Sequence, residues 1–363
     1  MTATSPAAPV HYPMAARRRC LLARHQASGC RACAKACPSG ALSVREKRLV
    51  FDPERCRGCG ACMAACPADA LIDPLLPHED LLQQIEEASA AGGLVVVEDG
   101  VRLPHEPAAA KANVVTVPTV RRFGLLEFLF AALSGAKTIE IFERGTAAPD
   151  ADPAGDAAAR AQAIAAGLGR TFEVRRSVPE EKTASAAPVV MARAPVSPEA
   201  AAAALKAARS LEAEAARRMA PRQEALRRLL RRFAADADDS ADSKETEGLR
   251  ALLPQPVVNP AKCVRCGVCE AVCPTTALKV DRPRGGFVLS LTPALCSGCR
   301  LCADVCFMIA LAMQPAATLR GALTKAPRTL LRKGDGAAAA ADGSADEWES
   351  KLSGFFDAPV YRT

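Results

Sequence analysis

Apolar residues between positions 92 and 174 occur in short runs separated by helical stretches. The segments 92–99 and 112–120 contain runs of valine that are typical of buried strands. Residues 123–142 predict a helix that ends at Gly135 and a strand from Thr138 to Phe142, and an alanine-rich helix around 154–168 precedes a further strand at 171–174. Strands that alternate with helices in this order predict a small parallel α/β layer.

The pattern on either side of this layer is different. Leu49 to Phe51 and Phe287 to Leu289 are short alternating stretches that follow polar turns, so each predicts a small hairpin. The expected fold class is therefore α+β, with two small modules separated by an α/β insert and a helical segment. We expect an N-terminal module at 1–80, the insert at 81–180, a helical segment with an acidic linker at 181–250, a C-terminal module at 251–315 and a largely flexible tail at 316–363.

The helical segment predicts two helices around Pro221. Ser197 and Pro198 favour a helix start, and that helix can continue to Met219, before Pro221. The second helix has an apolar face of Leu226, Leu229, Leu230 and Phe233, with arginines mostly on the opposite face, at positions 222, 227, 228, 231 and 232. Three interpretations stay open: a solvated face over the protein's own core, partner docking, or contact with a membrane surface.

Two later stretches contain few apolar residues that could pack into a core. Residues 234–247 hold six acids and one lysine and predict a flexible linker. In the tail, the end of the chain contains a possible docking helix with Trp348, Leu352, Phe355 and Phe356, which would pack on a partner subunit or on its own chain.

Composition indicates where the protein works. The first 20 residues contain no apolar core of a secretory signal, and the longest apolar helix, Leu125 to Ala136, is interrupted by Glu127. We therefore expect a cytoplasmic protein without a membrane span, whose thiols stay reduced and serve as metal ligands. The net charge of +7 is spread along the chain without interleaved aromatic residues, so we expect no nucleic-acid binding. A mildly basic surface would favour an acidic protein partner.

The 16 cysteines form four copies of one unit. Three copies have the spacing C-x2-C-x2-C-x3-C, and the first copy is stretched by a gap of nine residues after its first cysteine. Proline follows the last cysteine of the first three units, and Phe307 takes that place in the fourth, where it would pack over the cofactor. The units are Cys20, Cys30, Cys33 and Cys37; Cys56, Cys59, Cys62 and Cys66; Cys263, Cys266, Cys269 and Cys273; and Cys296, Cys299, Cys302 and Cys306.

This spacing favours iron–sulfur clusters. Two-residue gaps allow one loop to supply three thiolates to three corners of a cubane, while the cysteine before proline points to a second cubane. Structural zinc is the main alternative for any C-x2-C pair, but zinc sites typically use two pairs separated by a dozen or more residues. We expect four [4Fe–4S] clusters, which exchange single electrons and have no open coordination site. No catalytic triad, nucleotide-binding motif or spare thiol is present, so whether the chain is itself an enzyme stays open.

The first unit leaves three alternatives. A standard unit would have cysteine at position 27, which is Ala27. Cys20 can loop back to supply the missing ligand. Otherwise the first cluster would be a [3Fe–4S] cluster that lacks this corner, or His25 would be the ligand.

Residues 20–72 and 260–312 resemble the bacterial two-cluster ferredoxins, which also place three ligands in one loop and the fourth in the other. The resemblance implies that cluster 1 is bound by Cys20, Cys30, Cys33 and Cys66; cluster 2 by Cys37, Cys56, Cys59 and Cys62; cluster 3 by Cys263, Cys266, Cys269 and Cys306; and cluster 4 by Cys273, Cys296, Cys299 and Cys302. It also implies an electron-transfer protein.

Residues 90–145 resemble the iron–sulfur delta subunit of hydrogenase and heterodisulfide-reductase complexes, without the cysteines of that family. Together the resemblances imply a polyferredoxin-like subunit that carries electrons between a redox donor and the catalytic subunit of a larger oxidoreductase, such as a formate dehydrogenase, a hydrogenase, or a tungsten or molybdenum enzyme. The alternative is an iron–sulfur assembly, maturation or redox-regulatory subunit. Peripheral membrane contact also stays open.

Overall fold

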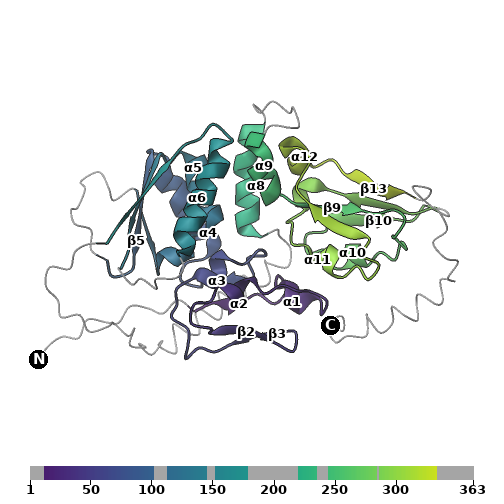
Figure 1. Cartoon of the computed structure of the whole chain (residues 1–363), viewed down its shortest axis with the longest axis horizontal. Helices are drawn as coiled ribbons and strands as arrows, with labels where there is room; N and C mark the ends of the chain where they lie inside the picture. Colours follow the sequence, from purple (N-terminus) through teal and green to yellow (C-terminus); the bar gives the residue numbers. More distant parts are fainter. Residues whose placement is uncertain are drawn as a thin grey trace, which may run out of the picture.

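The computed structural model describes residues 12–101, 113–144, 152–178, 220–234, 244–283 and 286–332. These residues form an N-terminal cysteine-rich module, a parallel sheet with its helices, and a C-terminal cysteine-rich module. In Figure 1 the sheet and the C-terminal module lie at opposite ends, with α8 and α9 between them and the N-terminal module below. The mixed α/β architecture agrees with the sequence prediction of two modules around a parallel-sheet region.

The N-terminal module combines short helices with two pairs of antiparallel strands. Its predicted hairpin is confirmed, because the two strands that follow the first cysteine unit pair from Leu42 with Phe51 to Arg45 with Arg48. A second pair joins Met14 to Ile72 and so closes the module near both of its ends. The elements are β1 (Met14–Ala15), α1 (Leu21–Arg24), α2 (Ala32–Ala36), β2 (Leu42–Arg45), β3 (Arg48–Phe51), α3 (Ala61–Ala64) and β4 (Leu71–Ile72).

The middle region is the expected parallel α/β layer. Its sheet has the order β6-β5-β7-β8, and every neighbouring pair is parallel. The predicted strands and helices are present, whereas α4 was not predicted and crosses the expected boundary at residue 80. The elements are α4 (His78–Ser89), β5 (Gly93–Glu98), β6 (Val114–Val117), the 3-10 helix η2 (Val120–Arg122), α5 (Leu125–Ser134), β7 (Thr138–Phe142), α6 (Pro153–Ala166) and β8 (Glu173–Ser177).

Local chemistry fixes the helix ends of this region. The carboxylate of Glu127 accepts a hydrogen bond from the Gly124 N–H (3.0 Å) at the start of α5. Gly135 ends α5 with a φ of +120°, a conformation that glycine adopts without steric strain. Asp152 caps α6 by accepting from the Gly155 N–H (3.0 Å), and Pro153 occupies its first turn.

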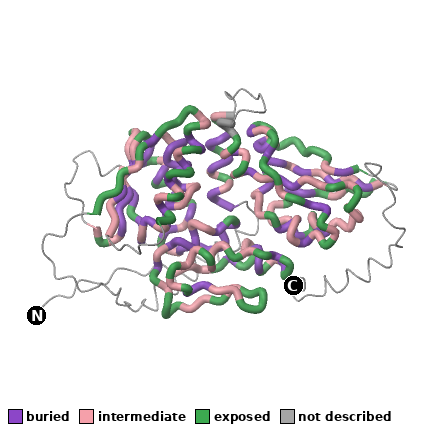
Figure 2. The backbone as a smooth tube through the Cα atoms, viewed as in Figure 1, coloured by how far each residue is buried: buried purple, intermediate pink, exposed green. Residues whose placement is uncertain are grey.

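Three more helices extend the core of the middle region. They are α8 (Pro221–Ala234), α9 (Lys244–Leu252) and α12 (Leu319–Leu323). Leu226, Leu229 and Leu230 of α8 are buried in one core with residues from the sheet, α4 and α5. Figure 2 shows that buried residues recur along these central helices. The apolar face of α8 therefore packs on the protein's own core, which was the first of the three sequence interpretations.

The prediction for the arginines of α8 holds for three of the five. Arg228, Arg231 and Arg232 are exposed, whereas Arg222 and Arg227 are buried. In addition, α9 begins at Lys244, inside the stretch that the sequence predicted as a flexible linker.

The C-terminal module repeats the hairpin and adds strands from distant segments. The hairpin β10–β11 is confirmed, with Leu278 opposite Leu291. The elements are β9 (Gln255–Val258), α10 (Val268–Ala271), β10 (Leu278–Asp281), β11 (Val288–Leu291), the 3-10 helix η3 (Pro293–Leu295), α11 (Leu301–Asp304), β12 (Leu311–Gln314) and β13 (Arg328–Arg332). Strand β13 pairs with β11. It lies with α12 in the segment that the sequence assigned to a flexible tail, so that assignment is wrong for these two elements.

Some predictions lie outside the described residues. These are the helix from Ser197 to Met219 and the docking helix around Trp348. Within the described ranges, no helix is both long enough and apolar enough to cross a membrane.

Candidate iron–sulfur sites

The cysteine loops share one local structure. In the second, third and fourth units the loop leads into a short helix, α3, α10 or α11. The residue before each of these helices is left-handed, with a φ of +75° at Gly60, +84° at Gly267 and +70° at Arg300. The first unit differs, since Arg31 before α2 has a φ of −138°. The regular spacing therefore builds the same tight turn three times, and the stretched unit builds a variant of it.

In the N-terminal module the thiols lie in two adjoining groups. Burial, followed by the nearby thiolates of Cys66, Cys30 and Cys20, raises the pKa of Cys33 to about 12. Burial also raises the pKa of Cys62, and the neighbouring thiolates of Cys59, Cys56, Cys33 and Cys37 add to that increase. Cys33 is thus close both to its own group and to Cys62, so the two groups adjoin one another.

The C-terminal module repeats this arrangement. Burial and the thiolates of Cys266, Cys263 and Cys306 raise the pKa of Cys269 to about 12. Burial raises the pKa of Cys302 in the same way, with additional effects from the thiolates of Cys299, Cys296, Cys273 and Cys269. The structure therefore brings together each of the four predicted sets of cysteines.

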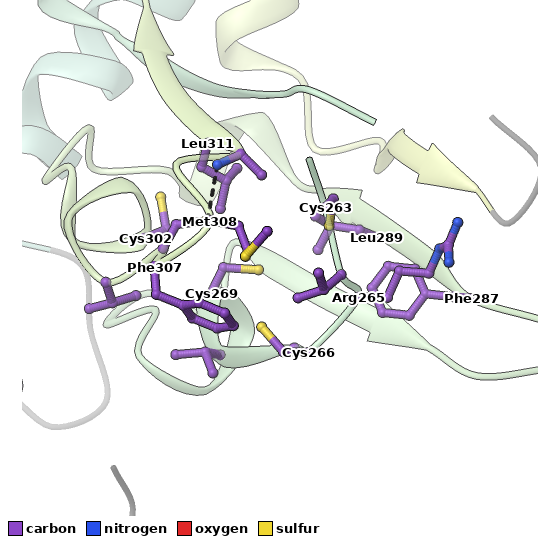
Figure 3. Close-up of a pocket in the computed structure, with 16 residues that line it drawn as sticks. Cys263, Arg265, Cys266, Cys269, Phe287, Leu289, Cys302, Phe307, Met308 and Leu311 are labelled. Atoms are coloured by element: carbon purple, nitrogen blue, oxygen red, sulfur yellow. Dashed lines mark hydrogen bonds between the residues drawn. The ribbon is translucent and has the colours of Figure 1, made fainter. Parts of the chain in front are cut away.

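Two of the groups surround apolar cavities. One cavity is lined by Cys20, Cys30, Cys33 and Cys66 together with apolar residues such as Leu21 and Leu71. The other is lined by Cys263, Cys266, Cys269 and Cys306 together with Phe287 and Leu289. Figure 3 shows Cys266, Cys269, Phe307 and Met308 around this second cavity. Phe307 lines it, but 42% of the residue remains exposed to solvent.

The residues present fit a cubane cofactor. Several thiol sulfurs accept backbone hydrogen bonds, as from the Ala70 N–H to Cys66 Sγ (3.2 Å) and from the Ala310 N–H to Cys306 Sγ (3.3 Å). Such bonds favour the thiolate form that binds iron. Among the described residues, no three Cys, His, Asp or Glu side chains could hold a single metal ion. The ligands of a cubane bind different iron atoms and need not converge on one point.

Cys20 lies where the stretched first unit needs a ligand. It lines the cavity of the first group, and it is among the thiolates that raise the pKa of Cys33. His25 is buried but does not line that cavity, and its Nδ1 accepts a hydrogen bond from the Ala27 N–H (3.0 Å). The geometry therefore favours Cys20 over His25.

The two modules contact each other beside the cysteines. One apolar cluster combines Leu21, Cys66, Ala68 and Ala70 of the N-terminal module with Val268, Val272, Leu301 and Val305 of the C-terminal module. Cys20 and Cys30 from one side, and Cys266 and Cys299 from the other, pack against it. The Gly29 N–H also donates to the Asp304 carboxylate (3.3 Å). Thiols of both modules thus lie at one interface.

Two buried arginines beside the cysteines were missed in the sequence. The Arg222 guanidinium donates to the carbonyl of Cys66, and that of Arg227 donates to the carbonyl of Cys296. Helical spacing could have revealed Arg222, which lies four residues before Leu226 and seven before Leu229. Arg227 lies three residues before Leu230, so it borders the same face.

Arg222 belongs to a buried polar network. Its Nε donates to Asp69 Oδ1 (2.6 Å), and its Nη1 lies 3.3 Å from Glu127 Oε1. Glu127 also lies 3.5 Å from Arg122 Nη1. Arg122 Nη2 in turn is 2.8 Å from His78 Nδ1. Burial, followed by the charges of Arg122 and Arg222, lowers the pKa of His78 well below its usual value.

Comparison with known proteins supports the chemistry of these sites. The family model described as a 4Fe-4S dicluster domain matches residues 28–70 and 262–310. Every cysteine except Cys20 lies inside these two segments, and the middle region is not assigned to a family. No curated protein and no solved structure matches the chain. Two dicluster domains with 16 cysteines imply four [4Fe–4S] clusters, so the chain contains two iron–sulfur electron-transfer domains.

Proposed function

We propose that the protein is an electron relay of four [4Fe–4S] clusters within a larger oxidoreductase. The ligand sets are those implied by the ferredoxin resemblance, and the four groups of thiols support them. Cys20 completes the first set, because it lines the same cavity as Cys30, Cys33 and Cys66. With four thiolate ligands, each cluster exchanges single electrons and offers no open site for a substrate.

The contact between the modules is the observation that carries this proposal. Cys33 packs against the apolar cluster that contains Cys62, and Cys269 packs against the one that contains Cys302. Cys20 and Cys30 pack against the same apolar cluster as Cys266 and Cys299. These three contacts connect all four groups in one continuous array, which a relay needs and four independent structural sites do not.

The partner of the relay is proposed from the resemblance alone. A polyferredoxin-like subunit delivers electrons to, or accepts them from, a catalytic subunit such as that of a formate dehydrogenase, a hydrogenase, or a tungsten or molybdenum enzyme. The middle region resembles the delta subunit of hydrogenase and heterodisulfide-reductase complexes but lacks its cysteines. We propose that it serves as a spacing and docking element in the cytoplasm.

The first experiment measures the cofactor content and its redox activity. The full chain, purified without oxygen, should contain about sixteen iron and sixteen acid-labile sulfide ions, four of each per cluster. In a potentiometric titration followed by EPR, all four clusters should be reducible, and magnetic coupling should extend across the module contact. Zinc without sulfide would overturn the proposal, and so would clusters that no physiological reductant can reduce.

The partner is tested by anaerobic purification of the tagged full chain from its source cells. We expect a copurifying oxidoreductase subunit that exchanges electrons with the reduced chain on addition of that enzyme's substrate. A maturation factor would behave differently, because it would transfer iron and sulfide to an acceptor protein and lose one cluster in doing so. That result would replace the relay with the alternative function.

A further inference from the structure

Helix α8 places one buried arginine against each cysteine-rich module. Arg222 is 2% exposed and Arg227 is 1% exposed. Each donates to the backbone carbonyl of a cysteine, Cys66 in the N-terminal module and Cys296 in the C-terminal module. The two sites differ in the groups that balance the positive charge.

Arg222 is balanced by carboxylates of the protein. Asp69 binds its Nε (2.6 Å) and its backbone N–H (2.8 Å), and Glu127 lies 3.3 Å from its Nη1. Burial by itself would lower the pKa of Arg222, but these two carboxylates and Cys66 raise it overall. The charge that Arg222 adds beside Cys66 is therefore largely cancelled by Asp69, which lies near the same thiol.

Among the residues that the structure describes, the hydrogen-bond partners of Arg227 are neutral carbonyl groups. Its Nη1 donates to the carbonyl oxygens of Ala322 (3.0 Å) and Pro293 (3.3 Å), and its Nη2 donates to that of Cys296. Its Nε finds no hydrogen-bond partner among the described residues. No ion pair to a carboxylate joins Arg227 within the part of the chain that the structure describes.

A buried cation of this kind needs an anion. Removing a charge from water is unfavourable unless an opposite charge lies nearby. Iron and sulfide bound by four thiolates form a negatively charged group, and Cys296 belongs to one of the four sets.

We propose that Arg227 is the counter-ion of the cluster bound by Cys273, Cys296, Cys299 and Cys302, and that it gives this cluster the highest reduction potential of the four. The inference depends on the ligand sets of the proposed function. A nearby positive charge favours the reduced, more negative form of a cluster. In a buried, poorly polarisable surrounding this effect is stronger than at the surface.

At the other three sites the arginines near the thiols are screened by solvent or balanced by carboxylates. Arg122, which is buried beside Gly60 in the loop of cluster 2, lies 3.5 Å from the Glu127 carboxylate. Arg121 near Cys59 and Arg265 near Cys263 are partly exposed, so solvent and salt screen them. At the remaining site, Asp69 offsets Arg222. Arg24, which lies near Cys299 on the other side of the module contact, is partly exposed and is screened in the same way, so Arg227 is the charge that distinguishes its site.

The test compares three variants of the full chain, loaded with clusters without oxygen. Arg227→Met removes the charge but keeps a long side chain, Arg227→Lys keeps the charge, and Arg228→Gln is a matched control. Arg228 is the next residue of the same helix, with a side chain that is 53% exposed and paired with Glu86. In an EPR-monitored titration, the highest of the four midpoint potentials should decrease in Arg227→Met. It should decrease less in Arg227→Lys and stay unchanged in Arg228→Gln. An unchanged potential in Arg227→Met, or equal decreases in both Arg227 variants, would overturn the inference.

A second measurement applies even if the Arg227 variants do not fold. Cys302→Ser should remove the signal with the highest potential, whereas Cys269→Ser should remove one with a lower potential. Loss of a low-potential signal in Cys302→Ser would overturn the inference. Iron and sulfide analysis of the wild-type chain separates the two proposals, because a chain with four intact clusters and the wrong order of potentials refutes only the role of Arg227.

Discussion

The two cysteine-rich modules have nearly the same ligand spacing but different surroundings. Both contain a hairpin and short helices after tight turns. The N-terminal module rests on a network that includes Asp69, Glu127 and Arg222. The C-terminal module instead receives Arg227, which donates to carbonyl oxygens, and a third strand, β13, beside its hairpin.

This difference shows that local spacing and distant packing determine separate properties of each cluster site. Local spacing fixes which thiols meet, since the loop from the first to the third cysteine of a regular unit spans only seven residues. Helix α8 supplies the charges near them from far along the chain. Duplicated modules can thus keep one cofactor while their electrostatic surroundings diverge, and the potential of a cluster responds to those surroundings.

The largest expected effect concerns the departure of the first unit from the regular spacing. Cys20→Ala should remove one iron from cluster 1 and give a [3Fe–4S] signal, or should lose that cluster entirely. The reason is that Cys20 is the thiol near Cys33 that lies outside the regular run. Iron analysis and EPR of the anaerobically purified chain measure this.

The matched control for Cys20 is His25, which is buried in the same module without lining the cavity. His25→Gln should keep the full iron content. Normal EPR in Cys20→Ala together with iron loss in His25→Gln would show that the histidine is the ligand.

The next effect tests the carboxylate that distinguishes the two modules. Asp69→Asn leaves Arg222 buried with one charged partner fewer, and breaking a buried ion pair costs about 3–5 kcal/mol. Asn also tolerates the left-handed backbone at this position, where φ is +46°. Urea unfolding measures the loss of stability. The reduction potential of cluster 1 should also rise, because the charge of Arg222 would be less fully balanced by carboxylates, as that of Arg227 is beside cluster 4.

The control for Asp69 is the solvent-accessible pair of Arg228 on α8 and Glu86 on α4. Glu86→Gln should change the free energy of unfolding by less than about 1 kcal/mol. Equal destabilisation by the two variants would contradict the role given to the buried carboxylate.

A smaller effect compares the repeated turns. A Cβ at Gly60 would lie 2.7 Å from Cδ of the buried Arg122, in addition to the strain of a φ of +75°. Gly60→Ala should therefore destabilise the protein by about 2–3 kcal/mol. At Gly267 the nearest atom is Nη2 of Arg282, 3.3 Å away at the end of a flexible side chain, so Gly267→Ala should cost only about 1 kcal/mol. Thermal unfolding of both variants decides this, and a larger loss at Gly267 would refute the steric argument.

Much of the fold was predictable because its signals are local. The valine runs at β5 and β6, the glycine after α5 and the proline that opens α8 each mark an element in the sequence itself. Helix α4 was missed although Glu79 and Asp80 in its first turn are a recognisable start signal. Strand β13 could not be predicted in this way, because its place depends on pairing with β11, far away in sequence.

The features of the candidate sites likewise fall into those set by local sequence and those set by distant packing. The four cysteine groups follow from spacing and from the ferredoxin resemblance, since each loop is short. The burial of Arg227 cannot be predicted from the sequence, because an arginine can lie either on a solvated face or beside an anionic cofactor. The packing of α8 between the two ends of the molecule determines which of these occurs (Figure 1).

The smallest effect is a pH dependence of stability that comes from His78, in the polar network of Arg222. His78 accepts a hydrogen bond from Arg122 at Nδ1, and its Nε2 lies 3.1 Å from the Leu71 carbonyl. Burial and the two nearby arginines lower its pKa in the folded protein, with Glu127 as the opposing charge. The folded state therefore binds this proton less tightly than the unfolded state. Stability should be full above pH 6.5 and should fall as the pH drops toward the lower folded pKa, by at most about 1.4 kcal/mol per pH unit.

Urea unfolding of wild type and His78→Gln between pH 7.5 and 5.5 measures this slope. The dependence of the unfolding free energy on pH should be weaker in His78→Gln than in wild type. Equal slopes would mean that other groups titrate, and would contradict the acid sensitivity assigned to the network around Arg222.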